Sequence, residues 1–331
     1  MLVSGLEQAL LPRRGRHRAR AAARLLGRGA VAILLSRRLV VVTGKGGVGK
    51  TTVAAALGLV AARAGKRTIV AEVARRGDVA SAFDRGGAAP FSETELAPGL
   101  FHISIDPQDA LEEYLRDQLP SGPVAEVLIR SRVFTMVAAA TPGMRELLTV
   151  GKLWELAQLD RRTPGADAYD LVVVDAPATG HGVAVLSAPR TFAAAAGSGP
   201  VARQGTIIDA MLSDPKRTAV VAVAKAEELA VTETGQLREA LLASMGLPLE
   251  RVVANALEPD RFSPQEAKLL ESHAGHPAVA GALSGHARAR HQRAQLARLR
   301  RLTDGRTPAR LPLHPGGPDL ERLADELASQ L

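Results

Sequence analysis

The chain has 331 residues and a formal net charge of +8, and it contains no cysteine, one tryptophan and two tyrosines. This length is enough for one large α/β domain or for two small domains. The lack of cysteine excludes disulfides, thiolate zinc sites, iron–sulfur clusters and thiol redox switches. No apolar run reaches the roughly 18 residues that a spanning helix needs, and no signal peptide is recognisable, so we expect a cytoplasmic protein.

The excess positive charge lies in the first 38 residues. They contain nine arginines and one acid, Glu7. Their net charge of +8 equals that of the whole chain, so the acidic and basic residues of the remainder balance. We expect residues 1–37 to form a basic, disordered N-terminal arm ahead of a domain that spans residues 38–331. Alternatively, the arm contacts an anionic membrane surface or a nucleic acid, or it is an over-extended start. The balanced remainder argues against a nucleic-acid-binding body.

A phosphate-binding loop follows the first predicted strand, residues 39–43. Residues 44–51 read Gly-Lys-Gly-Gly-Val-Gly-Lys-Thr, a complete Walker A pattern, and a helix is predicted over residues 52–64. Glycines let backbone N–H groups turn inward around phosphate oxygens, and the helix start adds the positive end of its dipole. We therefore expect this loop to bind ATP, and the predicted contacts are Gly44, Gly46, Gly47, Val48, Gly49, Lys50, Thr51 and Thr52.

Three side chains of the loop have predicted roles. Lys50 is expected to reach the β- and γ-phosphates, and the Thr51 hydroxyl is expected to hold Mg²⁺. Lys45 is a second lysine, directly after the first glycine. This form resembles the deviant Walker A class, which includes the MinD/ParA proteins, the nitrogenase iron protein and the ArsA-type ATPases. The resemblance implies that Lys45 crosses a dimer interface to the partner's nucleotide, so Lys45 and Lys50 are both expected to be catalytic.

Apolar runs continue at intervals along the chain, with helical segments between them. The later predicted strands are residues 68–73, 101–105, 169–175, 218–224, 251–257 and 309–313. Continuous apolar runs of this kind indicate a parallel sheet that is covered on both faces. The expected fold class is therefore α/β, a doubly wound and mainly parallel sheet of the P-loop NTPase type. Ligands are expected at the carboxyl ends of its strands.

A helical insertion is predicted between residues 106 and 160. This segment has wide apolar faces that include Phe134, Met136 and Trp154, and prolines interrupt it. Such faces are typical either of a groove that binds a hydrophobic client or of an ordinary helical layer packed on the sheet. The sequence leaves both interpretations open.

Asp175 closes the predicted strand 169–175 and is followed by Ala-Pro-Ala-Thr-Gly-His. A carboxylate at this place is typical of a Walker B or switch II acid, which binds Mg²⁺ through water. The segment resembles the Asp-x-Ala-Pro-Thr-Gly-His motif of the ArsA-type anion-pump and tail-anchored-protein-targeting ATPases. Together with the P-loop, the resemblance covers about residues 38–331 and implies an Mg-ATP-dependent ATPase that closes as a dimer. Two weaker matches are Asn255, which resembles the family's adenine-reading asparagine, and Pro312, in a segment that resembles the loop over the adenine.

Two departures from the family pattern limit what the resemblance implies. When the segment is anchored on Ala82-Phe83, Ala74 stands where the family has the switch I acid that positions the attacking water. Alanine cannot orient water or accept a proton, although Glu72 and Asp78 lie near it in the sequence. The lack of cysteine excludes both a thiolate arsenite site and a cysteine zinc clasp.

Three functions fit this pattern to different degrees. The leading one is an ATPase that couples Mg-ATP binding and hydrolysis to dimer closure, as a homodimer or with a paralogue, and to binding of a hydrophobic protein client. The alternative, which Ala74 favours, is a nucleotide-binding regulatory or scaffold subunit with little turnover. A surface-positioning ATPase of the MinD/ParA type fits less well, because residues 179–181 and the insertion resemble the first family more closely.

Overall fold

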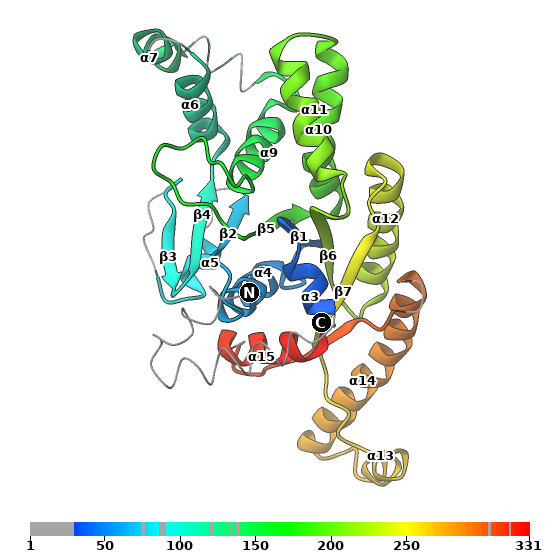
Figure 1. Cartoon of the computed structure of the whole chain (residues 1–331). Coiled ribbons are helices and arrows are strands. Elements are labelled where there is room, and N and C mark those ends of the chain that lie inside the picture. Colours follow the sequence, from blue (N-terminus) through cyan, green and yellow to red (C-terminus); the bar gives the residue numbers. More distant parts are fainter. Residues whose placement is uncertain are drawn as a thin grey trace, which may run out of the picture.

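The fold is organised around a sheet that has eight strands within the described ranges, in the order β3-β4-β2-β5-β1-β6-β7-β8 (Figure 1). The computed structural model describes residues 30–73, 77–85, 91–119, 122–132, 134, 136, 140–303, 306–317 and 319–331. All neighbouring strands pair in parallel except β3 and β4, which are antiparallel. The predicted fold class, a mainly parallel α/β sheet with flanking helices, is confirmed.

The strands follow the predicted apolar runs closely. They are β1 (Leu39–Gly44), β2 (Thr68–Val73), β3 (Thr94–Ala97), β4 (Leu100–Ile105), β5 (Leu171–Ala178), β6 (Thr218–Lys225), β7 (Leu249–Leu257) and β8 (Ala309–Pro312). The sequence analysis missed β3, because this short edge strand has no apolar run of its own. It also ended β5 three residues early, at Asp175.

The helices connect and cover these strands. They are α3 (Ala30–Leu35), α4 (Lys50–Arg63), α5 (Asp78–Ser81), α6 (Pro107–Gln118), α7 (Gly122–Arg130), α9 (Met144–Leu156), α10 (Thr179–Ala196), α11 (Pro200–Leu212), α12 (Glu228–Met245), α13 (Pro264–Glu271), α14 (Pro277–Leu302) and α15 (Leu320–Gln330). Local sequence explains several helix starts. Asp106 caps α6 by accepting a hydrogen bond of 2.8 Å from the Gln108 N–H, and Pro107 fills the first helical position.

The direction in which the chain crosses the sheet changes between β1 and β5. From β1 the chain passes through α4 to β2, on one side of β1, whereas from β5 it passes through α10 and α11 to β6, on the other side. Right-handed crossovers in opposite directions place their helices on opposite faces of the sheet. The crevice at the carboxyl ends of β1 and β5 is therefore the place where this topology exposes a ligand site.

The helices α6, α7, α9, α10 and α11 rise together beyond the sheet, at the end towards which β2 and β4 point (Figure 1). Three of them, α6, α7 and α9, form the connection from β4 to β5. Helix α9 packs against β5 and α10. These helices therefore stand above the carboxyl edge of the sheet, which carries the predicted nucleotide site.

Helix α3 differs from the expected N-terminal arm. Residues 30–35 were expected within the arm, but they form a helix whose Val31, Leu34 and Leu35 are buried in the core. Burying the apolar run Ala-Val-Ala-Ile-Leu-Leu lowers the free energy of the folded chain. Helix α3 is buried in part by packing against α15. The remaining part of the expected arm, residues 1–29, lies outside the described residues. Within the described ranges, no helix is both long and apolar enough to cross a bilayer.

A buried ionic cluster fastens the α9 region to the sheet. The Arg161 guanidinium, 1% exposed, lies 2.6 Å from both Glu93 and Glu155, and the Tyr169 hydroxyl also donates to Glu93 at 2.6 Å. Burial raises the pKa of Glu155, but hydrogen bonding from Arg161 and the charge of Lys152 outweigh burial and hold this pKa below its ordinary value. For the same reason the pKa of Glu93 is lowered, and that of Arg161 is raised.

We expect Arg161→Met to lower the free energy of unfolding by about 3–5 kcal/mol at pH 7, because it removes the buried guanidinium that the half-buried Glu93 and the buried Glu155 share. Glu93 and Glu155 have depressed pKa values in the folded protein, so the stability they contribute is complete above their unfolded pKa and is lost as the pH falls through the folded pKa. In urea titrations the difference between wild type and variant should therefore shrink as the pH falls below about 4.5, the ordinary glutamate pKa. Arg162→Met is the matched control on the exposed neighbour. A difference that stays constant with pH would contradict this assignment.

Candidate nucleotide site

The P-loop joins the end of β1 to the start of α4. Gly49 is the residue before the helix and has a left-handed φ of 94°, and the helix begins at Lys50. The loop therefore faces the first turn of α4, where unpaired backbone N–H groups and the positive end of the dipole favour an anion. The sequence analysis began the helix at residue 52, two residues later than it begins in the structure.

Two glycines of the loop are required by close approaches within the fold. A Cβ added at Gly44 would lie 2.1 Å from the backbone oxygen of Val223 on β6, and one added at Gly49 would lie 2.3 Å from Asn255 Nδ2. Both contacts are shorter than atoms can approach. At Gly46 and Gly47 an added Cβ would meet nothing within 4 Å, so the central part of the loop faces open space.

The hydroxyl of Thr51 donates a hydrogen bond of 2.7 Å to Asp175 Oδ2. This contact joins two motifs that lie 124 residues apart. It follows from the sheet, because β1 and β5 are adjacent and Val42 pairs with Asp175 in register. Asp175 is 8% exposed. A hydroxyl beside a carboxylate at the first turn of α4 is the oxygen donor set that Mg²⁺ prefers, so these residues fit the expected ion.

The segment after Asp175 is tied to β1 as well. The Thr43 hydroxyl donates a hydrogen bond of 3.0 Å to the backbone oxygen of Pro177. A Cβ added at Gly182 would lie 2.9 Å from the same hydroxyl, so α10 begins in close contact with β1. His181, at the start of α10, is exposed and its Nε2 lies 3.8 Å from Glu146 Oε1 of α9. The segment after Asp175 thus links β1 to the helices above the sheet.

Both lysines of the loop have partners within their own subunit. Lys50 Nζ donates a hydrogen bond of 3.2 Å to the backbone oxygen of Lys45. Lys45 Nζ lies 3.5 Å from Glu233 Oε1 of α12, and the Thr179 hydroxyl lies 3.3 Å from Glu233 Oε2. The sequence analysis missed Glu233, because α12 carries no motif and only the fold brings it to the P-loop.

Glu72 lies beside Asp175 on the neighbouring strand, and the two residues pair in register between β2 and β5. Its buried carboxylate lies 3.2 Å from His102 Nε2 on β4 and accepts a hydrogen bond of 3.0 Å from the Asp78 N–H. Glu72 is therefore used to hold the start of α5, the segment that follows the expected switch I position. Ala74 itself lies outside the described residues.

Asn255 reaches the back of the P-loop. Its Nδ2 donates a hydrogen bond of 2.9 Å to the backbone oxygen of Val48. A bulge in β7 aims this side chain, because Ala254 and Leu257 pair with Arg310 and Pro312 of β8, so three steps on β7 match two on β8. Ala256 within the bulge has a φ of 56°, which is unfavourable for alanine. Pro312 pairs with Leu257, two residues beyond Asn255, at the same edge of the sheet.

The apolar faces of residues 106–160 divide into buried and exposed parts. On α9, Val150, Leu153 and Leu156 are fully buried and belong to the core. In contrast, Val124 and Val127 of α7 are 50% and 69% exposed, and Met136 is 71% exposed. The core interpretation therefore holds for α9, whereas Val124, Val127 and Met136 are exposed apolar side chains.

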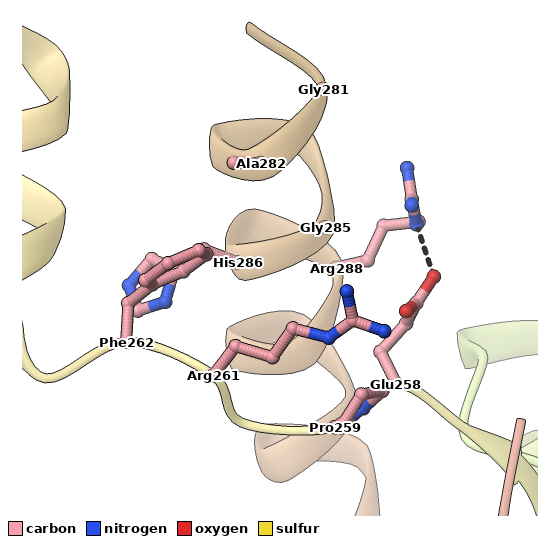
Figure 2. A pocket seen from close by; sticks show the side chains of 9 residues that line it. All are labelled: Glu258, Pro259, Arg261, Phe262, Gly281, Ala282, Gly285, His286 and Arg288. Atoms are coloured by element: carbon pink, nitrogen blue, oxygen red, sulfur yellow. Dashed lines mark hydrogen bonds and ion pairs between the residues drawn. The ribbon is translucent and has the colours of Figure 1, made fainter. Parts of the chain in front are cut away.

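A separate cavity of about 250 Å³ lies between the loop after β7 and the first half of α14 (Figure 2). Arg288 and Glu258 form an ion pair of 2.9 Å on one side, and the rings of Phe262 and His286 lie against each other on the opposite side. None of the P-loop residues lines this cavity. It is therefore distinct from the nucleotide site.

The chain is similar in sequence to known ATPases. Residues 37–197 match the model of the family described as anion-transporting ATPases. The chain is 34% identical over 235 residues to the ATPase BagA of Mycobacterium tuberculosis, a match that covers 69% of this chain and 68% of that protein. It is also 28% identical over 264 residues to an arsenical pump-driving ATPase of Acidiphilium multivorum. This match covers 73% of this chain and 41% of that protein. The chain thus matches about two fifths of the length of that pump-driving ATPase.

We expect Gly49→Ala to destabilise the protein by about 1–3 kcal/mol, because alanine is strained at this positive φ and its Cβ would meet the Asn255 amide. Gly46→Ala is the control, since nothing lies within 4 Å of its added Cβ, and its melting temperature should stay at the wild-type value. Adding Asn255→Ala to Gly49→Ala should recover part of the loss. Denaturant titrations of the four proteins test this, and equal stability of both glycine variants would show that the close approach is absent.

Proposed function

The chain belongs to the ArsA-type anion-transporting ATPase family, and on this basis we propose that it binds Mg-ATP at the P-loop and hydrolyses it. The observation that carries the proposal is the hydrogen bond between Thr51 and Asp175, which joins the two ATPase motifs at the first turn of α4. The proposed ATPase domain spans residues 38–331, with the helical segment of about 106–160 as an insertion in it.

The proposed roles follow from the positions of the side chains. Lys50 moves its ammonium group from the Lys45 carbonyl to the β- and γ-phosphates, and the loop N–H groups hold the phosphate oxygens. Thr51 binds Mg²⁺ directly and Asp175 binds it through water. When bound, Mg²⁺ neutralises charge on the phosphates. Asn255 and Pro312, at the carboxyl ends of β7 and β8, contact the adenine.

Dimer closure is the second part of the proposal. Lys45 carries a charge that Lys50 already supplies to its own nucleotide, so we assign it to the nucleotide of a second subunit, either a second copy or a paralogue. About a third of its side chain is exposed, directly after the end of β1. The family resemblance and this exposed position support the assignment.

A hydrophobic protein client is the third part. The exposed Val124, Val127 and Met136 support it, because a helix face of this kind is stable in water only at some cost. The helices that carry the switch II contacts also stand above the sheet, so nucleotide state can change their positions. The names of the pump-driving relatives refer to arsenicals. We do not propose a thiolate arsenite site for this chain, because it has no cysteine.

The alternative function is a regulatory or scaffold subunit that binds nucleotide with little turnover. Ala74 favours it, because no acid stands at the aligned switch I position. The structure adds that Glu72, one candidate substitute, is already occupied by His102 and the Asp78 N–H.

We expect Lys50→Ala to weaken Mg-ATP binding about 10- to 100-fold, which corresponds to the 1.5–3 kcal/mol of a hydrogen bond to a charged group. Thr51→Val should reduce the dependence of ATP affinity on Mg²⁺ while the affinity for metal-free ATP changes little. Isothermal titration calorimetry with and without Mg²⁺ measures both effects. Wild-type affinity in the Lys50 variant would refute the proposed site.

Lys45→Ala should bind a non-hydrolysable ATP analogue with near wild-type affinity but remain monomeric or form only an open dimer. Sedimentation velocity and small-angle scattering, with Mg²⁺ and the analogue, measure mass and envelope. Lys216→Ala, on the exposed turn before β6, is the control for loss of a lysine. A Lys45 variant with unchanged mass and envelope would exclude the role across the interface.

Ala74→Asp distinguishes the ATPase from the regulatory subunit. If wild-type turnover is slow for want of a water-positioning acid, this change should raise kcat by ~10²–10⁴-fold. A coupled phosphate-release assay measures it, with Ala74→Asn as the uncharged control. Fast wild-type turnover that Glu72→Gln or Asp78→Asn abolishes would show instead that a neighbouring acid has taken the role.

A further inference from the structure

Glu233 of α12 contacts two parts of the nucleotide site at once. One carboxylate oxygen lies 3.5 Å from Lys45 Nζ in the P-loop, and the other lies 3.3 Å from the Thr179 hydroxyl at the head of α10. Its side chain is 25% exposed, and that of Lys45 is 32% exposed. This acid belongs to neither of the motifs that the sequence identifies.

The two partners of this contact differ in rigidity. Helix α12 is anchored by residues on both sides of Glu233, since Ala230, Val231, Thr234 and Leu237 are all buried. Lys45, in contrast, extends from a loop on a flexible four-carbon stem. When the contact breaks, Lys45 is therefore the group that moves, and the Glu233 carboxylate remains in place.

The position of Glu233 also sets an electrostatic constraint. While Lys45 is paired with it, the carboxylate is neutralised beside a loop that is built to receive phosphates. If Lys45 leaves, an uncompensated negative charge stays near the triphosphate and repels it. The structure therefore opposes the movement of Lys45 across a dimer interface until other contacts offset the loss.

We propose that Glu233 is a positioning residue that clamps Lys45 and Thr179 together in the nucleotide-free subunit and competes with engagement of Lys45 by a partner's nucleotide. This inference rests on the proposed function. Release of Lys45 leaves the Glu233 carboxylate in place with the Thr179 hydroxyl still beside it, so the P-loop lysine moves while the start of α10 stays held. Glu233 thereby raises the concentration of nucleotide at which the dimer closes.

The clamp is tested in the full chain by zero-length carbodiimide cross-linking and peptide mass spectrometry. A carbodiimide joins an amine to a carboxylate only where the two are in contact, so Lys45 and Glu233 should be linked without nucleotide. The link should be lost with Mg²⁺ and a non-hydrolysable ATP analogue. No link in the nucleotide-free wild type, or a link that the analogue leaves unchanged, overturns the proposal.

The consequence for closure is tested by sedimentation velocity over a series of analogue concentrations. Glu233→Gln should lower the concentration at half-dimerisation by roughly two- to fivefold, the range expected for a partly exposed ion pair. Glu239→Gln, an exposed acid on the same helix, should have no effect. In Lys45→Ala, which should not form the closed dimer, adding Glu233→Gln should not restore closure. A Glu233→Gln midpoint equal to or above that of the wild type overturns the proposal.

The two proposals fail in different ways. If the wild type stays monomeric with every nucleotide, the dimer of the proposed function is refuted, whereas the cross-link and its response to nucleotide still decide whether the clamp exists. Because the cross-link is measured in the wild type, that decision holds even if the Glu233 variant does not fold.

Discussion

The pairing of β1 with β5 is the constraint on which the nucleotide site depends. It places the P-loop and Asp175 at the same edge of the sheet, and Thr51 then reaches Asp175 at 2.7 Å across the gap between the strands. Both strands are buried along almost their whole length, so their register is held by the core and not by the site. The precision of the site is therefore supplied by apolar packing beneath it.

Charges around the P-loop form a set of contacts that a nucleotide must rearrange. Lys50 donates a hydrogen bond to a backbone carbonyl, Lys45 forms an ion pair with Glu233, and the Thr51 hydroxyl donates a hydrogen bond to Asp175. Each of these polar groups has a partner within the chain, and under the proposed function each exchanges that partner for a phosphate or a metal ion. Binding therefore replaces one set of hydrogen bonds with another, which keeps the cost of burial low in both states.

The helices above the sheet combine a rigid base with an exposed apolar surface. Arg161, Glu93, Glu155 and Lys152 lock α9 to the sheet through buried ion pairs, which specify one arrangement of this layer. Helix α7, further along the same connection, leaves Val124 and Val127 exposed. Movement at this end of the molecule is therefore easier at α7 than at α9, because α7 has fewer buried contacts to break.

The sequence by itself determined the mainly parallel α/β class, most strand positions, the P-loop and Asp175. These features depend on local patterns: apolar runs of strand length, glycine spacing, and a carboxylate at a strand end.

Tertiary structure alone decided the order of the strands and the short edge strand β3, which has no apolar run. It decided the burial of α3, because an apolar run beside a basic segment can be read either way until its partner helix α15 is known. It also brought Glu233 to Lys45 and, through the bulge in β7, aimed Asn255 at Val48. Such contacts join residues more than 180 positions apart, and no local pattern encodes them, because they arise only when separate elements pack on one sheet.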